Sequence, residues 1–166
     1  FAGCGSSASE NNAADKTNNE TSTEAGSEGA ASASDIKVGV IYIGDENEGY
    51  TAAHMAGIDE MMANLGLDES QVIEKTTVPE DESAYDAAVD LADQGCNIVF
   101  ADSFGHESFI LQAAKEFPDV QFCHATGTKA HTEKVANFHN TFASIYEGRY
   151  LAGITAGMKL NEMIES

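Results

Sequence analysis

Basic side chains are scarce in this chain. Its 166 residues include only 8 Lys and Arg against 28 Asp and Glu, which gives a formal net charge of -20 at pH 7. Proteins bind phosphate backbones by neutralising them with Lys and Arg, so this balance argues against a nucleic-acid partner. It also argues against direct binding to an anionic lipid surface, although a covalent anchor with a spacer can hold an acidic domain beside a membrane.

The chain also lacks a long apolar run and a cysteine framework. No stretch approaches the roughly 20 apolar residues that a membrane-spanning helix needs. One of its three cysteines, Cys4, lies in a polar leader, so the three do not form a disulfide framework. Cys96 and Cys123 stand beside or within apolar runs, and we expect both to be small core residues. A Cys96–Cys123 disulfide or a reactive thiol is the alternative.

Signature motifs of several functional classes are missing as well. There is no G-x-G-x-x-G after the first predicted strand and no G-x-x-x-x-G-K-[ST], so both nucleotide-phosphate fingerprints are absent. No G-x-S-x-G elbow occurs, and the histidines do not follow a recognised zinc spacing. The sequence therefore predicts no catalytic centre, no cofactor and no metal site. The histidines are His54, His106, His124, His131 and His139.

The amino terminus resembles the tail of a bacterial lipoprotein signal peptide. Small residues precede Cys4, and a run rich in Ser, Gly and Glu follows it. In that class of signal the cysteine carries a diacylglycerol on its sulfur, so we expect residues 1–4 to end the signal peptide, with Cys4 as the anchor. A chance cysteine in a tail is the alternative. Residues 5–34 have scarcely any large apolar side chain, which predicts a disordered acidic linker.

Residues 35–166 alternate between apolar runs and segments of helical period. The runs predict strands near 37–43, 72–77, 97–101, 120–125 and 136–142, with the second strand nearer an edge of the sheet. Strands that alternate with helices imply a parallel sheet covered on both faces. The predicted fold is therefore a doubly wound α/β lobe.

Several details of the helices follow from residue spacing. The first helix should end near Gly66, the second should begin with a capping box formed by Ser83 and Asp86, and Gly95 should stop it. The last, over 145–160, contains three glycines, for which close packing against the sheet is the expected compensation. The apolar stripe predicted for the first helix is Tyr50, Ala53, Gly57, Met61 and Leu65.

Ligands of open α/β sheets bind beyond the carboxyl ends of the strands. The segments expected there are 44–51, 101–106, 125–132 and 139–144. They offer rings, amides and hydroxyls with one well-placed acid, Asp102, which suits a planar, neutral ligand rich in hydrogen-bonding groups. Asp102 could instead only cap the following helix. His54, one turn after Tyr50, could face the pocket, but a position on the helix surface is expected. The other polar and aromatic side chains are Asn47, Tyr50, Thr51, Ser103, Phe104, Thr126, Thr128 and Asn140.

Three segments resemble the basic membrane protein family of lipoproteins. "VGVIYIGDENEGYTAAHMAGIDEM" is similar to the family's opening, with an aromatic residue, Thr and His in spaced order after the first strand. "NIVFADSFGHESFILQAAKEFPDVQFCHATG" resembles its third strand, Ser-Phe-Gly turn and fourth strand. "YEGRYLAGITAGM" looks like the helix after its fifth strand. Together they cover nearly all of residues 36–158.

The resemblance implies a function. The family has a two-lobed architecture like that of type I periplasmic binding proteins; it closes on purine nucleosides or nucleobases and delivers them to an ABC permease without catalysis. It implies a lipid-anchored monomer on the outer face of the bacterial cytoplasmic membrane. Tyr50 falls where the family stacks an aromatic ring on the base. Asp45, Asn47 and Thr51 fall in the same loop, and Ser103, Phe104 and Gly105 fall in the second loop.

The family continues into a second lobe, whereas this sequence stops at residues 159–166, so we expect the amino-terminal lobe alone. Two other readings stay open. A two-lobed receptor for a sugar or an autoinducer should have more charged side chains and Trp in its pocket, and this chain has no Trp. An enzyme on a flavodoxin-like sheet would need a cofactor loop, which the sequence does not show.

Overall fold

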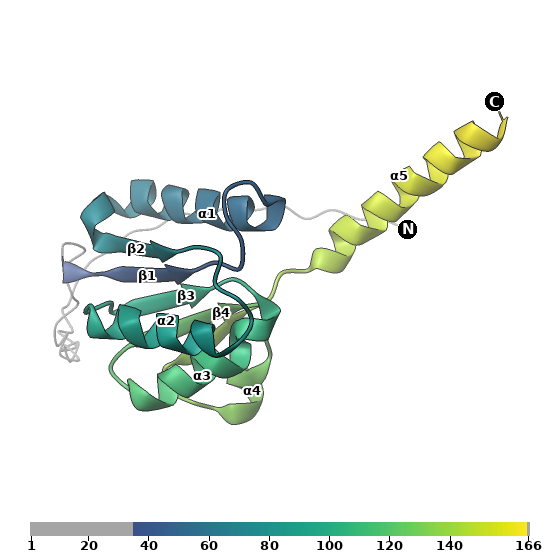
Figure 1. Ribbon diagram of the computed structural model, residues 1–166. Coiled ribbons are helices and arrows are strands. Elements are labelled where there is room, and N and C mark those ends of the chain that lie inside the picture. The colour runs from purple at the N-terminus through teal and green to yellow at the C-terminus, as the bar shows by residue number, and fades with distance from the viewer. Residues whose placement is uncertain (1–34, 166) are drawn as a thin grey trace, which may run out of the picture. The chain divides into compact units, whose positions relative to one another are not determined.

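The computed structural model describes residues 35–165, and within them it forms a five-stranded sheet whose strands are all parallel (Figure 1). The strand order is β2-β1-β3-β4-β5. This confirms the predicted α/β fold, the five strands and the edge position of β2. Cys4 and the predicted linker lie outside the described residues. The strands are β1 (Val38–Ile41), β2 (Val72–Lys75), β3 (Ile98–Ala101), β4 (Gln121–Ala125) and β5 (Phe138–Thr141).

Helices connect the strands and cover the sheet from two sides. Helix α1 lies on one face, and α2 and α3 lie together on the other (Figure 1). Two short 3₁₀ turns, η2 (Glu69–Gln71) and η3 (Phe104–His106), and the short helix α4 were not predicted. The helices are α1 (Gly49–Leu65), α2 (Glu82–Asp93), α3 (Glu107–Glu116), α4 (Lys129–Glu133) and α5 (Ile145–Glu165).

Alternation along β1 divides the core in two. Val38, Val40 and Tyr42 belong to the cluster beneath α1, whereas Ile41 belongs to the larger cluster beneath α2 and α3. Each such side chain, when fully buried, contributes roughly 1.5–3 kcal/mol through removal of apolar surface from water. Successive strand residues point to opposite faces, so one four-residue strand anchors both layers.

The cysteines of the lobe are both free thiols. Cys96 is buried in the larger cluster, as predicted, while Cys123 is half-buried. The alternative of a Cys96–Cys123 disulfide is therefore wrong. Burial raises the pKa of both thiols, which keeps them protonated and weakly nucleophilic at neutral pH.

Two helix ends follow the sequence and one start does not. Gly66 and Gly95 adopt left-handed φ angles of 67° and 85° and end α1 and α2, as predicted. The capping box assigned to Ser83 and Asp86 is wrong, because Asp81 caps α2 instead. The Asp81 side chain accepts a 2.9 Å hydrogen bond from the Ser83 main-chain N–H, one of the N–H groups that a helix start leaves unpaired.

The inner face of α1 differs from the predicted stripe. Thr51 is fully buried, and Met55, Ile58, Met61 and Met62 pack on the sheet, whereas Ala53, Gly57 and Leu65 are exposed. Of the predicted stripe only Met61 packs in the core. Ala and Gly fit either face of a helix, so including Ala53 and Gly57 shifted the predicted apolar stripe by about one residue from the observed inner face. The shift turns His54 inward, to a half-buried position.

The expected packing of the last helix against the sheet is not found. Every described side chain of α5 is exposed. A Cβ added at Gly148, Gly153 or Gly157 would meet nothing within 4 Å, so these glycines are not explained by close approach to the sheet. None of the helices within residues 35–165 has the length and apolar content needed to cross a membrane.

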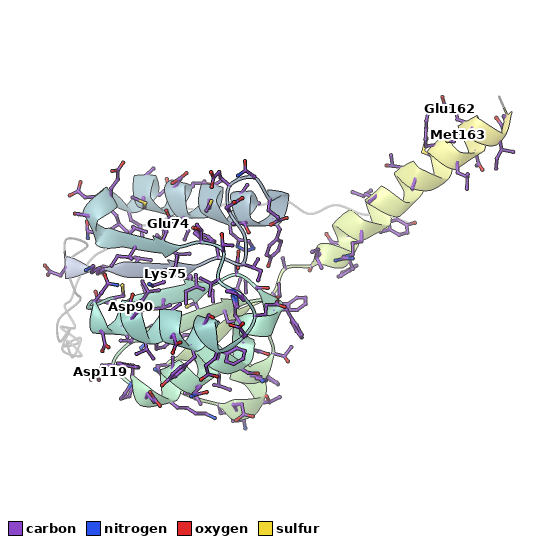
Figure 2. The ribbon with its side chains drawn as sticks, viewed as in Figure 1. Glu74, Lys75, Asp90, Asp119, Glu162 and Met163 are labelled. Carbon is purple, nitrogen blue, oxygen red and sulfur yellow. The ribbon has the colours of Figure 1, made fainter. Side chains whose placement is uncertain are left out.

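An ion pair joins the edge strand to the opposite layer. The Lys75 ammonium on β2 lies 2.6 Å from the Asp90 carboxylate on α2, and both residues are labelled in Figure 2. The pair lowers the pKa of Asp90 through its hydrogen bond with Lys75. Because half of the Asp90 side chain is exposed, solvent screens the pair and its contribution to stability is small.

Two glycine substitutions test the packing of β1. A Cβ at Gly39 would lie 2.9 Å from Leu91 Cδ1 and 3.1 Å from Leu91 Cβ, so Gly39→Ala should destabilise the lobe by about 1–3 kcal/mol through overpacking. Gly57→Ala, on the open side of α1, meets nothing within 4 Å and should stabilise it by about 1 kcal/mol through helix propensity. Urea denaturation measures both, and equal effects would contradict the described packing.

Candidate ligand-binding site

The sheet has a topological switch point between β1 and β3. These strands are neighbours, but α1 follows β1 on one face while α3 follows β3 on the other. The connections that leave their carboxyl ends therefore diverge at this switch point, which is where ligands of open α/β sheets bind. The loops that border it are residues 42–48 and 102–106, two of the segments that the sequence places at the site.

Asp102 ties the two loops together. Its side chain is only 3% exposed, and Oδ1 accepts a 2.9 Å hydrogen bond from the Ile43 main-chain N–H. Its main-chain oxygen accepts a 2.5 Å hydrogen bond from the Tyr50 phenol. The second carboxylate oxygen, Oδ2, is buried and has no hydrogen-bond partner in the structure. Burial raises the pKa of Asp102, as expected for a carboxylate that has lost its water.

Tyr50 stands at the start of α1 with part of its ring open to solvent. Its exposed fraction is 38%, and the ring meets His54 edge-on with centroids 4.6 Å apart. Burial, and then the charges of Asp102 and Glu48, raise the pKa of the Tyr50 phenol. The phenol therefore stays protonated at neutral pH and keeps its bond to Asp102.

Glu48 fixes the helix start that carries Tyr50. Its carboxylate accepts hydrogen bonds from the main-chain N–H groups of Tyr50 (2.9 Å) and Thr51 (2.8 Å). These two bonds lower the pKa of Glu48. The sequence prediction missed this cap because Glu is an uncommon N-cap residue, although an acid directly before a helix start was a usable signal.

The remaining predicted residues of the first loop have different positions. Asp45 Oδ1 accepts hydrogen bonds from the main-chain N–H (2.9 Å) and the side-chain amide (3.2 Å) of Asn47, so these two side chains stabilise the turn. Thr51 is fully buried, and its hydroxyl accepts a 3.2 Å bond from Gly44 N–H. Thr51 thus holds the loop from beneath.

The second loop is fastened by a residue that the sequence did not single out. Glu80 accepts hydrogen bonds from the Ser103 hydroxyl and from Gly105 N–H, the latter at 2.8 Å. A Cβ at Gly105 would overlap the Glu80 carboxyl group, so this clamp requires glycine. Phe104, between the two clamped residues, is 68% exposed.

Thr126 closes the third side of the site, after β4. Its φ of 74° lies in the left-handed region, which costs free energy for a residue other than glycine. Its hydroxyl lies near the Tyr50 phenol and opposes the rise in that group's pKa, but Oγ1 is buried without a well-formed hydrogen bond. Strain and an unpaired buried hydroxyl together are typical of a functional loop.

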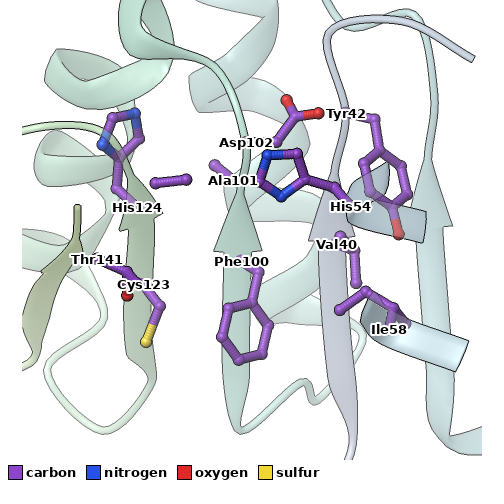
Figure 3. Close-up of a pocket in the computed structure, with 11 residues that line it drawn as sticks. Val40, Tyr42, His54, Ile58, Phe100, Ala101, Asp102, Cys123, His124 and Thr141 are labelled. Carbon is purple, nitrogen blue, oxygen red and sulfur yellow. The ribbon is translucent and has the colours of Figure 1, made fainter. Parts of the chain in front are cut away.

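A groove of about 220 Å³ extends from Asp102 along the α1 face of the sheet (Figure 3). Among the predicted site residues only Asp102 lines it, beside His54, for which the helix surface was expected, and Tyr42, which the sequence did not single out. The rest of its wall is mainly apolar and includes Val40, Ile58, Phe100, Cys123 and Ala125. No cluster of His, Cys, Asp and Glu in residues 35–165 is arranged to hold a metal ion.

The predicted residues therefore fall into three groups. Contacts at the switch point bring together Tyr50, Asp102 and Thr126. Ser103, Phe104 and Gly105 border it on a loop held by Glu80. Asp45, Asn47 and Thr51 build the loop that precedes Tyr50, and the structure shows them bonded to that loop itself.

The fold and the switch point define the class of this chain as a doubly wound α/β lobe with a parallel sheet. A family model described as "ABC transporter substrate-binding protein PnrA-like" matches residues 35–166. The chain belongs to this family, which is the Bmp or basic membrane protein family, and the resemblance found in the sequence is confirmed. ABC substrate-binding proteins of this kind are normally non-catalytic.

Individual relatives agree with the family. The chain is 37% identical over 130 residues to a purine-binding protein of Brucella abortus (strain 2308), covering 77% of this chain and 36% of that protein. It is 36% identical over 62 residues to a candidate ABC transporter glucose-binding protein of Haloferax volcanii, covering 37% of this chain and 15% of the other.

A solved structure also agrees. An ABC transporter solute-binding protein from Conexibacter woesei matches with a TM-score of 0.54 and 27% identity, covering 64% of this chain and 35% of its own. The chain thus spans about a third of the length of the Brucella protein and of this structure.

The buried carboxylate gives a prediction for stability against pH. Because the pKa of Asp102 is raised above its ordinary 3.8, the folded lobe holds a proton that the unfolded chain has released, and stability falls as pH rises through that window. Asp102→Asn removes this loss. The free energy of unfolding of the variant, relative to the native sequence, should therefore increase as pH rises above 3.8.

Asp90→Asn is the matched control. The pKa of Asp90 is lowered, so its contribution is present at higher pH and is lost as pH falls, and the variant's relative stability should change in the opposite direction. Urea denaturation at several pH values measures both. A pH-independent effect of Asp102→Asn would show that the carboxylate is not destabilised in the fold.

Proposed function

We propose that this chain is the amino-terminal lobe of the substrate-binding protein of an ABC importer and that its ligand is a purine nucleoside or nucleobase. The observation that carries the proposal is the unpaired Asp102 carboxylate oxygen beside the partly exposed Tyr50 ring at the switch point. Family membership and the 37% identity to a purine-binding protein support the same ligand class.

The chemistry of these two groups suits a purine. An exposed aromatic ring offers a face on which a planar base stacks. Asp102 Oδ2 is a buried hydrogen-bond acceptor that has no donor within the protein. A hydrogen bond from an N–H on the edge of a base would offset the cost of burying this oxygen. Loops on opposite sides of Asp102, held by Glu48 and Glu80, would keep the ring and the carboxylate in a fixed relation before ligand arrives.

Tyr50 should be the principal stacking residue. In the full-length protein, Tyr50→Ala should weaken purine binding about ten- to hundredfold, since one base–aromatic stack is worth about 1–3 kcal/mol. Tyr50→Phe keeps the ring but loses the hydrogen bond to the Asp102 main chain, so it should retain most of the affinity. Calorimetric titration of guanosine, inosine, adenosine and adenine measures these effects.

Tyr85→Phe is the control for the lost phenol. Tyr85 belongs to α2, on the other face of the sheet, where its hydroxyl donates to Glu116. It should leave every affinity unchanged. If purines bind and Tyr50→Ala binds them as tightly as the native protein does, the stacking role is wrong.

A sugar is the second candidate, because the Haloferax relative is named as a candidate glucose-binding protein. A pyranose also uses an aromatic face and a carboxylate, but this chain supplies no Trp. Glucose titrated under the same conditions separates the two: binding of glucose without binding of any purine would replace the proposal.

Membership of this family also suggests the partners and the cellular location of the protein. We propose that the complete protein delivers its ligand to ABC permease subunits as a monomer, at the outer face of the cytoplasmic membrane, with Cys4 as its lipid anchor. The small residues before Cys4 and the acidic polar stretch after it support the anchor. Acyl chains hold a protein at a membrane because each buried CH₂ contributes about 0.8 kcal/mol.

The anchor is tested in the native organism. Mass spectrometry of the membrane fraction should find a diacylglyceryl group on the Cys4 sulfur, and Cys4→Ser should release the protein from that fraction. Cys123→Ser removes a thiol within the lobe and should leave the protein at the membrane. Native protein with an unmodified Cys4 that does not sediment with membranes would contradict the anchor.

A further inference from the structure

A buried polar network lies behind the loop after β4 (residues 126–130), among residues that the proposed function does not use. It joins Glu107 at the start of α3, His124 on β4 and Asn140 on β5. Glu107 is 6% exposed and His124 is fully buried. Their partners are the loop after β4 and the main chain of the second loop, so the network joins the connections that follow β3 and β4.

Asn140 is the centre of this network. Its Oδ1 accepts a 2.7 Å hydrogen bond from the Ala130 main-chain N–H, which can only donate, and this fixes which way the amide is turned. The amide nitrogen therefore faces inward. It donates to Glu107 Oε1 and to His124 Nδ1, each at 3.3 Å.

The orientation of Asn140 decides the state of His124. Because Nδ1 accepts from the amide, it carries no proton, and Nε2–H donates to the Ser103 main-chain oxygen at 2.6 Å. His124 is thus neutral and protonated at Nε2. Burial lowers its pKa, and Glu107 on α3 opposes that effect while His106 on η3 and Lys129 on α4 reinforce it.

The same groups hold the loop that carries Thr126. Glu107 Oε1 accepts a 2.6 Å hydrogen bond from the Lys129 main-chain N–H, and Asn140 holds the next residue, Ala130. A Cβ at Gly127 would overlap the Glu107 carboxylate and would lie 2.6 Å from His124 Nδ1, so the loop wraps directly onto the network. The left-handed φ of Thr126 is therefore fixed from its carboxyl-terminal side.

We propose that Asn140 is a positioning residue for the ligand site: it selects the Nε2–H form of His124 and locks residues 126–130 so that the Thr126 hydroxyl lies beside Tyr50. The consequence for binding rests on the proposed function, whereas the tautomer and the locked loop do not. A network whose buried members are all paired specifies one geometry, which is what a preformed site requires.

Asn140→Asp is the sharpest test, since it keeps the shape and the acceptor for Ala130 N–H but replaces the inward donor with a carboxylate oxygen. Nitrogen NMR of the native protein should show His124 as the Nε2–H form between about pH 6 and about pH 8, where an unperturbed histidine titrates. In the variant, His124 should take up a proton within that range, because a negative charge beside Nδ1 raises its pKa.

Two separate measurements follow the rigidity of residues 126–130 and the affinity for purines. Asn140→Ala should speed hydrogen exchange of the Ala130 amide about tenfold or more, the effect of losing one hydrogen bond of ordinary strength, and leave the amides of β1 unchanged. Both variants should weaken purine binding by a similar factor, and Asn140→Asp should make binding depend on pH. His139→Gln, on the same strand but bonded outward to Gln121, should match the native protein throughout.

The outcomes are distinguishable. If the native protein binds no purine but the NMR and exchange results hold, the proposed ligand is wrong and the positioning role of Asn140 stands. If purines bind and Asn140→Asp keeps both the affinity and the titration of His124 unchanged, the positioning role is wrong. An Nδ1–H tautomer in the native protein overturns it as well.

Discussion

The hydrogen bond from Ile43 N–H to Asp102 Oδ1 links the ends of β1 and β3, the two neighbouring strands that form the switch point. Tyr50, at the start of α1, bonds to the main chain of the same residue. The loop of residues 42–48, the loop of residues 102–106 and the start of α1 are therefore all bonded to one buried acidic residue, Asp102. The geometry of the candidate site depends on that acid more than on any other side chain.

Unpaired buried groups and a strained backbone at this edge of the sheet lower the stability of the lobe but leave groups free to bind a ligand. Asp102 keeps one oxygen unpaired, Thr126 keeps a strained backbone and an unpaired hydroxyl, and both lie at the same edge of the sheet. Elsewhere in residues 35–165 the polar side chains at loop ends are mostly paired, as with Asn137, whose amide nitrogen lies 2.8–2.9 Å from three carbonyl oxygens. Unpaired buried groups gathered at a switch point are what a ligand with complementary donors and acceptors would satisfy.

Strand positions and fold class were predictable because strong apolar periodicity and family motifs both mark them. The face that α1 turns to the sheet was not predictable, because Ala53 and Gly57 suit either side of the helix. For the same reason the half-buried position of His54 was not expected. The clamps Glu48 and Glu80 were also missed. Their carboxylates accept from main-chain N–H groups of neighbouring or distant residues, and sequence spacing does not report where those N–H groups lie. Of the predicted site, Tyr50 and Asp102 meet as expected, whereas Asp45, Asn47 and Thr51 are bonded within their own loop.

The proposed function requires that a purine bind at the switch point between β1 and β3 rather than in the apolar groove beside it. A crystal structure of the full-length protein with inosine tests this most directly. In that structure the base should stack on the Tyr50 ring, with a base N–H within hydrogen-bonding distance of Asp102 Oδ2. A base lodged over Phe100 and Cys123 in the groove, or a ligand that leaves Asp102 Oδ2 unpaired, would contradict it.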